Sequence, residues 1–334
     1  MKLAIIFILL AVLSAGCGGP QKQPQVGGDI SVTDFRGRSI GLQQPARRVV
    51  CLIESALSGI YMLQAQERLV GVPTSVYRES VAPQYALLDE RIQRQAIPAP
   101  GNWDFVNLES LVALQPDLVI IWSSQEDAVA NIERLGIPVY GVMLRGLQDV
   151  YKEIDDLGVL LGKKERARQL IQWTRNELQV FQVQGKNTQR EKIYFMWSQG
   201  LLHTAGKKST VNEILEAAGA ANACPLNQEH CVINIEALLS WKPDLIVMWH
   251  NERMDPQDVL ADSRLQTLPA VRKGQVRELP SVFFCDMWTL KFQYVIKMVA
   301  KWSDPQRFST VDLSREKSRM LRFLYGEQAG ALLE

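Results

Sequence analysis

The sequence contains an internal repeat that constrains the fold more than any other feature. Residues 107–122 and 234–249 are identical at seven of sixteen positions, at a fixed offset of 127. Each copy predicts a short amphipathic helix that ends before a proline and is followed by an uninterrupted apolar run. Such a run, apolar on both faces, is typical of a strand inside a parallel sheet. The two copies therefore predict two α/β lobes of similar plan.

Four further segments have the composition of buried strands and flank the two copies. They are residues 48–53, 137–140, 192–197 and 275–279. Between the lobes, residues 163–187 lack proline and carry apolar residues at helical spacing up to Phe181. As far as Gln184 this stretch would form a helix of about 33 Å, a stiff connector. The predicted fold class is α/β: two Rossmann-like lobes with parallel sheets, joined by one long backbone helix.

The chain divides into five predicted parts. They are a signal peptide at 1–16, a lipidated Cys17 with a flexible linker to 28, an N-terminal α/β lobe at 29–162, the connecting helix at 163–187, and a C-terminal α/β lobe with the C-terminal helix at 188–334. The apolar run after Lys2 is too short to span a bilayer, and small residues precede Cys17. Leu13–Cys17 resembles a bacterial lipobox, which implies export and a lipid anchor; an ordinary signal peptide is the alternative.

Charge and histidine content exclude two kinds of site. Lys and Arg number 37 and Asp and Glu 36, so the net charge of +1 gives no reason to expect a nucleic-acid partner. The only histidines are His203, His230 and His250, all late in the chain. A metal site built from several imidazoles of both lobes is therefore excluded. Eight tryptophans are present and need an explanation.

Four cysteines follow the predicted anchor: Cys51, Cys224, Cys231 and Cys285. Disulfides persist outside the cytosol, and four cysteines allow three pairings. Cys224 and Cys231 enclose a short polar loop, so we expect a disulfide between them. The alternative, a metal site of both cysteines with His230, lacks a fourth ligand.

Several segments in the same order carry a resemblance to a known family. They are residues 30–40, 45–50, the two repeat units, 160–165, 209–222 and 302–308. Over residues 30 to about 326 the chain resembles the substrate-binding lipoproteins of bacterial ABC importers for iron complexes and cobalamin. The resemblance implies a two-lobed binding fold, a monomer without enzymatic activity or cofactor, and an ABC permease with its ATPase as partners.

The resemblance also implies one exposed glutamate per lobe that docks on the permease. Glu213, in the segment 209–222, matches the position in the second lobe. In the first lobe Glu79 is the nearest candidate, although the residues around it depart from the family's pattern. An exposed glutamate on a helix is more often a solvated side chain, so docking is weighed against that reading.

The cargo is expected at the carboxyl ends of the parallel strands, where α/β sheets bind ligands. Predicted ligand-binding residues at or beside these ends are Glu54, Ser55, Trp103, Trp122, Trp197, Trp249 and His250. Trp288 joins them because the family uses the segment 283–288 for its cleft. The repeat gives Trp122 and Trp249 matching positions, so two indoles would flank a shared groove. Aromatic walls suit a large, flat, partly apolar cargo such as a corrinoid, haem or siderophore complex.

Other functions stay open at this point. A small metal oxyanion such as molybdate or tungstate would need hydroxyl and backbone donors, which Ser55, Ser123, Ser124 and Ser198 offer. A tethered ligand sensor is a further alternative. An enzyme is disfavoured because no nucleophile elbow, Walker loop or zinc-protease motif is present. His250 or His203 would suit as an axial ligand to a metal in a macrocycle.

Overall fold

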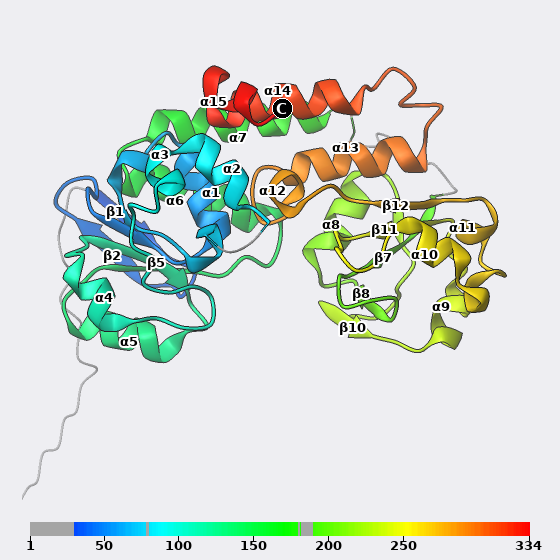
Figure 1. Ribbon diagram of the computed structural model, residues 1–334, viewed down its shortest axis with the longest axis horizontal. Coiled ribbons are helices and arrows are strands. Elements are labelled where there is room, and N and C mark those ends of the chain that lie inside the picture. Colours follow the sequence, from blue (N-terminus) through cyan, green and yellow to red (C-terminus); the bar gives the residue numbers. More distant parts are fainter. Residues whose placement is uncertain (1–29, 78–79, 180, 182–189) are drawn as a thin grey trace, which may run out of the picture.

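The computed structural model describes residues 30–77, 80–179, 181 and 190–334, which form two lobes side by side beneath a layer of helices (Figure 1). The N-terminal lobe contains a parallel sheet of four strands in the order β4-β3-β5-β6. They are β3 (Val49–Cys51), β4 (Leu69–Gly71), β5 (Leu118–Trp122) and β6 (Val139–Val142). Every residue of β3 and of β6 is buried, as expected for a parallel sheet covered on both faces.

The C-terminal lobe repeats this plan. Its parallel sheet has the order β12-β11-β7-β9. The strands are β7 (Lys192–Met196), β9 (Ala221–Asn222), β11 (Leu245–Met248) and β12 (Val276–Glu278). In both lobes the repeat strand, β5 or β11, lies at the centre of the parallel sheet. Its neighbour there is the first strand of that sheet in the sequence, β3 or β7. The α/β fold class with two related parallel sheets and a helical backbone is therefore confirmed.

The repeat also reproduces local hydrogen bonding. Asn107 caps α4 (Leu108–Ala113) and Asn234 caps α9 (Ile235–Trp241); each amide oxygen accepts from the backbone N–H three residues on, at 2.9 Å. After each helix the residue before proline takes a left-handed conformation, Gln115 with φ 48° and Lys242 with φ 50°. A right-handed helix cannot continue into proline, so both copies turn at the same place into their strand.

The two faces of each sheet belong to different cores. Val49 and Ile120 of one sheet and Phe195 and Val247 of the other face a single large core that runs along the helical layer. The opposite faces form two smaller cores, one in each lobe. Alternation of side chains along a strand produces this division. The large shared core makes the helical layer the structural connection between the lobes.

Helices fill the space around the sheets. In the N-terminal lobe they are α1 (Glu54–Met62), α2 (Ala82–Leu88), α3 (Glu90–Gln93), α5 (Glu126–Arg134) and α6 (Leu147–Leu160). In the C-terminal lobe they are α8 (Thr210–Ala217), α10 (Pro256–Ala261), α11 (Pro269–Arg272) and α12 (Val282–Cys285). Short 3₁₀ turns span Gln66–Arg68, Thr74–Tyr77 and Ser263–Leu265.

The connecting helix predicted over residues 163–187 corresponds to α7 (Lys164–Gln179); residues 180 and 182–189 lie outside the described part. Further helices accompany it: α13 (Phe292–Ser303), α14 (Leu313–Tyr325) and α15 (Glu327–Leu332). α14 runs beside α7 and contacts α1, and α15 contacts α2, so the end of the chain packs on the N-terminal lobe (Figure 1). The backbone between the lobes is thus a layer of several helices.

Two small antiparallel sheets, each of two strands, complete the fold. β1 (Ile30–Thr33) pairs with β2 (Ser39–Leu42), and β8 (His203–Ala205) pairs with β10 (His230–Val232). None of the helices in the described ranges is long and apolar enough to cross a membrane. The predicted lipid anchor at Cys17 lies outside those ranges.

The predicted disulfide is not formed in the structure. The sulfur atoms of Cys224 and Cys231 lie 3.9 Å apart and both thiols are free and buried. A disulfide requires a sulfur–sulfur distance of about 2.05 Å, so the two residues are adjacent without being bonded. The short loop brings them together as expected, but hydrogen bonds of β8 to β10 hold Cys231 in its strand without a covalent link.

Candidate functional site

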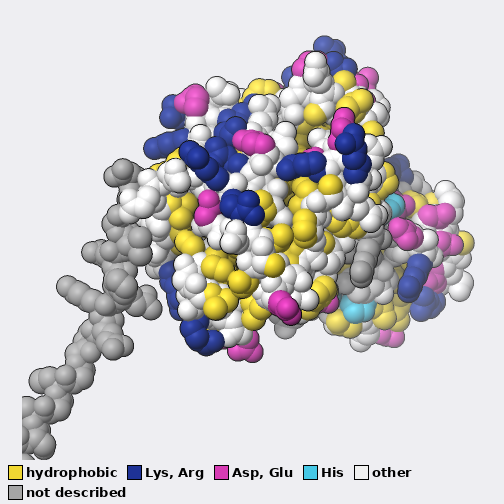
Figure 2. Space-filling view, turned by 60° about the vertical axis from the view of Figure 1, so that its left-hand side comes forward, with side chains coloured by type: hydrophobic (Ala, Val, Ile, Leu, Met, Phe, Trp, Pro, Cys, Tyr) yellow, Lys and Arg dark blue, Asp and Glu magenta, His cyan; other side chains and the backbone are white. Residues whose placement is uncertain are grey.

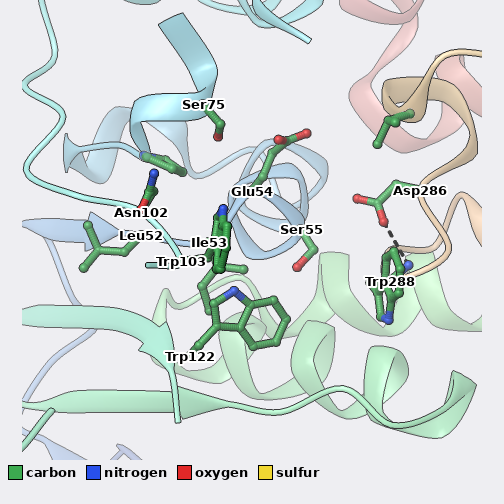
Figure 3. Close-up of a pocket in the computed structure, with 12 residues that line it drawn as sticks. Leu52, Ile53, Glu54, Ser55, Ser75, Asn102, Trp103, Trp122, Asp286 and Trp288 are labelled. Carbon is green, nitrogen blue, oxygen red and sulfur yellow. Dashed lines mark hydrogen bonds between the residues drawn. The ribbon is translucent and has the colours of Figure 1, made fainter. Parts of the chain in front are cut away.

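A cavity of about 580 Å³ lies between the N-terminal lobe and the segment that leads into α13 (Figure 3). Its lining residues are Leu52, Ile53, Glu54, Ser55, Pro73, Ser75, Asn102, Trp103, Trp122, Val282, Asp286 and Trp288. Five of the eight predicted ligand-binding residues are in this set: Glu54, Ser55, Trp103, Trp122 and Trp288. The volume lies within the usual range for ligand and cofactor sites, about 300–1,000 Å³.

The N-terminal wall of the cavity comes from the carboxyl ends of two central strands. Trp122 is the last residue of β5, and Glu54 and Ser55 begin α1 directly after β3. Because β3 and β5 are parallel neighbours, their ends lie at one edge of the sheet. Topology therefore brings together side chains that are separated by almost seventy residues of sequence, as ligand sites in open α/β sheets require.

Trp103 stands on a tightly built turn at the mouth of the cavity. The side-chain oxygen of Asn102 accepts from the backbone N–H of Asp104 at 3.0 Å and of Phe105 at 3.3 Å. The Asn102 amide donates to the hydroxyl of Thr74 at 3.0 Å, which ties the turn to the neighbouring loop. Trp103 is nevertheless 65% exposed. A large apolar side chain held in place but left open to solvent is suited to contact a ligand.

The opposite wall is formed by Asp286 and Trp288, which face Trp103 and Trp122 across the cavity in Figure 3. The backbone N–H of Trp288 donates to the Asp286 carboxylate at 2.9 Å. Burial raises the pKa of Asp286, and the nearby Lys291 ammonium opposes that rise. The sequence predicted that the segment 283–288 borders the cleft but did not single out Asp286. Its position two residues before Trp288 was the only indication that it would line the cavity.

The remaining predicted indoles lie behind this wall. Trp197 stacks on Trp288 with ring centroids 6.3 Å apart, and Trp249 meets Trp288 edge-on at 6.0 Å. Neither lines the cavity, and Trp249 is only 8% exposed. The expected pairing of Trp122 with Trp249 across a groove is therefore replaced by Trp122 facing Trp288, because Trp249 turns into the aromatic core of its own lobe.

His250 also lies outside the cavity lining. Its Nδ1 is 3.3 Å from the Glu278 carboxylate, and the same carboxylate oxygen accepts from the backbone N–H of Asn251. His250, just after β11, is thus paired with Glu278 at the end of β12, and its ligand-binding role stays a prediction. Across the described ranges, no group of three or more His, Cys, Asp or Glu side chains is arranged to hold a metal ion.

Two buried polar groups, one in the cavity lining and one near Asp286, have no hydrogen-bond partner among the residues that the structure describes. They are the hydroxyl of Ser55 and both carboxyl oxygens of Glu153, which lies on α6 and is 1% exposed. Burial raises the pKa of Glu153 to about 8, with Asp286 and Asp156 adding to the rise. A buried carboxyl without donors avoids ionisation by keeping its proton. The Ser55 hydroxyl in the lining and the Glu153 carboxyl near Asp286 are therefore buried polar groups with incomplete hydrogen bonding.

The lining carries carboxyl groups but no basic side chain. Glu54 and Asp286 are part of it, and none of its twelve residues is Lys or Arg. On the face shown in Figure 2, basic side chains gather towards the top, above a broad area where hydrophobic side chains are exposed. The lining residues themselves therefore offer an anionic ligand no lysine or arginine side chain.

The two predicted docking residues have different standing in the structure. Glu79 lies outside the described residues. Glu213 is exposed on α8, and its carboxylate accepts from the backbone N–H of Leu147 at 2.8 Å. Leu147 is the first residue of α6, so Glu213 of the C-terminal lobe binds the start of a helix in the other lobe. Its docking role stays a prediction.

Two similar α/β lobes on a helical layer, with a cavity at the strand ends, define a two-lobed solute-binding protein. The family described as "Periplasmic binding protein" matches residues 49–283, and the chain belongs to this family. It is an ABC-type periplasmic solute-binding protein, a transport component and not an enzyme, and such proteins work with a permease and an ATPase.

Three relatives illustrate the range of the family. An uncharacterised ABC transporter substrate-binding lipoprotein, YvrC of Bacillus subtilis, is 25% identical over 72% of this chain and 77% of its own. The vitamin B12-binding protein of Vibrio parahaemolyticus is 23% identical over 71% and 82%. The molybdate-binding protein MolA of Haemophilus influenzae is 23% identical over 86% and 88%. The molybdate-bound structure of MolA covers 89% of this chain and 98% of its own, with a TM-score of 0.74 and 21% identity, which shows a shared fold.

Proposed function

We propose that this protein captures an iron complex, such as a siderophore chelate or haem, or a corrinoid, and delivers it to a membrane permease. The observation that carries the proposal is the cavity with Trp103 and Trp122 on one side and Trp288 on the other. Flat aromatic walls bury large ligand area at low conformational cost. The B12-binding relative is consistent with this class of cargo.

The charge of the lining supports a narrower choice within that class. Glu54 and Asp286 face the cavity without a basic residue beside them in the lining. An uncharged or cationic complex, such as a ferric hydroxamate or a corrinoid, meets no repulsion there. A molybdate ion would meet these two carboxyl groups, and no lysine or arginine is among the lining residues. The oxyanion alternative is therefore less favoured, although the hydroxyls of Ser55 and Ser75 are present.

The test is a binding panel on the mature protein with a ferric hydroxamate, haem, cobalamin and molybdate. We expect one of the first three to quench tryptophan fluorescence. Trp103→Ala should weaken that binding about tenfold, the value of one stacked aromatic contact, without lowering the Tm. Isothermal titration calorimetry and thermal unfolding measure the two effects.

Trp173→Phe is the matched control because Trp173 stacks on Phe323 in the helical layer, with centroids 4.3 Å apart, away from the cavity. It should bind cargo like the wild type. The proposal is wrong if molybdate alone raises the Tm while no iron complex or corrinoid binds.

A further inference from the structure

The two-stranded sheet of β8 and β10 carries a pair of imidazoles that do not line the cavity. Nδ1 of His203 and Nε2 of His230 lie 3.3 Å apart. His230 is exposed and His203 half-buried. The two residues are separated by 27 positions in the sequence, and the pairing of β8 with β10 brings them together.

Strand register explains why both imidazoles share one face. His203 lies opposite Val232, and His230 lies opposite Ala205. Side chains opposite each other in an antiparallel ladder point to the same side, and residues two apart on one strand do so as well. Cys231, between His230 and Val232, therefore points to the buried side and cannot join the pair. This geometry also excludes the site of Cys224, Cys231 and His230 considered from sequence.

The pair is held in place before any ligand arrives. The backbone carbonyl of His203 accepts from the N–H of Trp197 at 3.0 Å, and its own N–H donates to Gly200 at 3.0 Å. The His230 ring stacks on Trp197, with centroids 6.2 Å apart and planes at 25°. The backbone of His203 and the ring of His230 are thus held in place, while His230 is exposed to solvent.

We propose that His203 and His230 form a binding site for a late first-row divalent metal ion, such as Ni²⁺, Cu²⁺ or Zn²⁺. With metal–nitrogen distances of about 2.05 Å, two nitrogens 3.3 Å apart enclose an angle of about 107° at the ion, close to tetrahedral. Imidazole nitrogen is a preferred ligand of these ions. Two protein ligands leave the other coordination positions of the ion to water or to a small chelator. Either can reach the ion from solvent because His230 is exposed. This site is separate from the cavity and does not depend on the proposed cargo.

The test is a titration of the mature, untagged protein with NiCl₂ and ZnCl₂, followed by calorimetry. Ni²⁺ should also quench tryptophan fluorescence, because Trp197 stacks directly on His230. His203→Ala and His230→Ala should each weaken binding at least tenfold. His250→Ala is the matched control: it removes the chain's only other histidine, which pairs with Glu278, and should leave binding within twofold.

Each other outcome counts against the paired site. Absence of metal binding by the wild type overturns it, as does binding that survives loss of either His203 or His230. Because His203 is half-buried, the Tm of each variant is measured as well. If His203→Ala unfolds, His230→Ala and His203→Gln carry the test. Cargo binding in the cavity is measured on the same variants, and its presence or absence bears only on the proposed function.

Discussion

Glu153 shows how much a single buried group controls. Its carboxyl oxygens find no hydrogen-bond donor in the described part of the chain, and the Asp286 carboxyl of the cavity lining is near enough to raise its pKa further. Burial raises its pKa to about 8, whereas in an unfolded chain the value is near 4.5. Between these two values the folded protein holds a proton that the unfolded chain has released. Stability therefore falls as the pH rises through this window.

Replacing this carboxyl by an amide tests the point. Wild-type stability should be highest below pH 4.5 with respect to this group and should fall by up to about 1.4 kcal/mol per pH unit towards pH 8. Glu153→Gln should remove that slope and be more stable by a few kcal/mol at pH 8. Urea unfolding at several pH values measures it. Glu109→Gln, at an exposed position on α4, is the control; parallel profiles of wild type and Glu153→Gln would contradict the assignment.

At the scale of elements, three helices of the backbone layer are joined through one buried ammonium. Lys297 of α13 is 1% exposed and donates to Glu177 of α7 at 2.7 Å and to Glu316 of α14 at 2.6 Å. Arg319, on the exposed side, pairs with both carboxylates. Burial acts to raise the pKa of Glu316, but the hydrogen bonds and positive charges of Lys297 and Arg319 together outweigh it, and the pKa is lowered. This contribution is present at neutral pH and is lost as the pH falls through the lowered pKa.

Loss of the central lysine should separate these helices. Lys297→Ala removes the buried cation from two largely buried carboxylates and leaves them only the half-exposed Arg319, so we expect a loss of about 3 kcal/mol in the free energy of unfolding. Arg319→Ala removes a pair that is half exposed and should cost less than about 1 kcal/mol. Denaturant unfolding of both variants gives the comparison. Equal losses would mean that the buried ammonium has no special role.

At the scale of the whole molecule, the two lobes touch through Glu213. Its carboxylate accepts from the N–H of Leu147, at the positive end of the α6 dipole. A side chain on Gly146 would have its Cβ 2.4 Å from the Glu213 oxygen, so the carboxylate would have to shift there. A permease that binds Glu213 must take this carboxylate away from α6. If Glu213 docks as predicted, docking and the relative position of the lobes would thereby be coupled.

Two variants separate contact from docking. Glu213→Ala removes the carboxylate, whereas Gly146→Ala displaces it but leaves it available. Both should loosen the lobes, at a cost of about 0.3–1 kcal/mol, seen as a broader interlobe distance distribution between spin labels. Only Glu213→Ala should reduce cargo uptake through the permease in reconstituted vesicles. Equal uptake by Glu213→Ala and the wild type would remove Glu213 from the docking surface.

Local sequence patterns predicted the architecture and half of the site. The repeat forecast both sheets because strand burial and the helix end before proline are local properties, reproduced at Gln115 and Lys242. The rule that ligands bind at strand ends pointed to Glu54, Ser55 and Trp122, since it depends only on where a strand stops. These features are encoded within a few residues of each other.

Tertiary packing decided which of the predicted side chains face the cavity. Trp122 and Trp249 occupy equivalent places in the repeat, yet Trp249 is buried against Trp288 and only Trp122 lines the cavity. The lone carboxyl of Glu153 and the pairing of His203 with His230 likewise depend on contacts between distant segments. Side-chain burial and orientation depend on what packs above each strand end, and that neighbour comes from elsewhere in the chain.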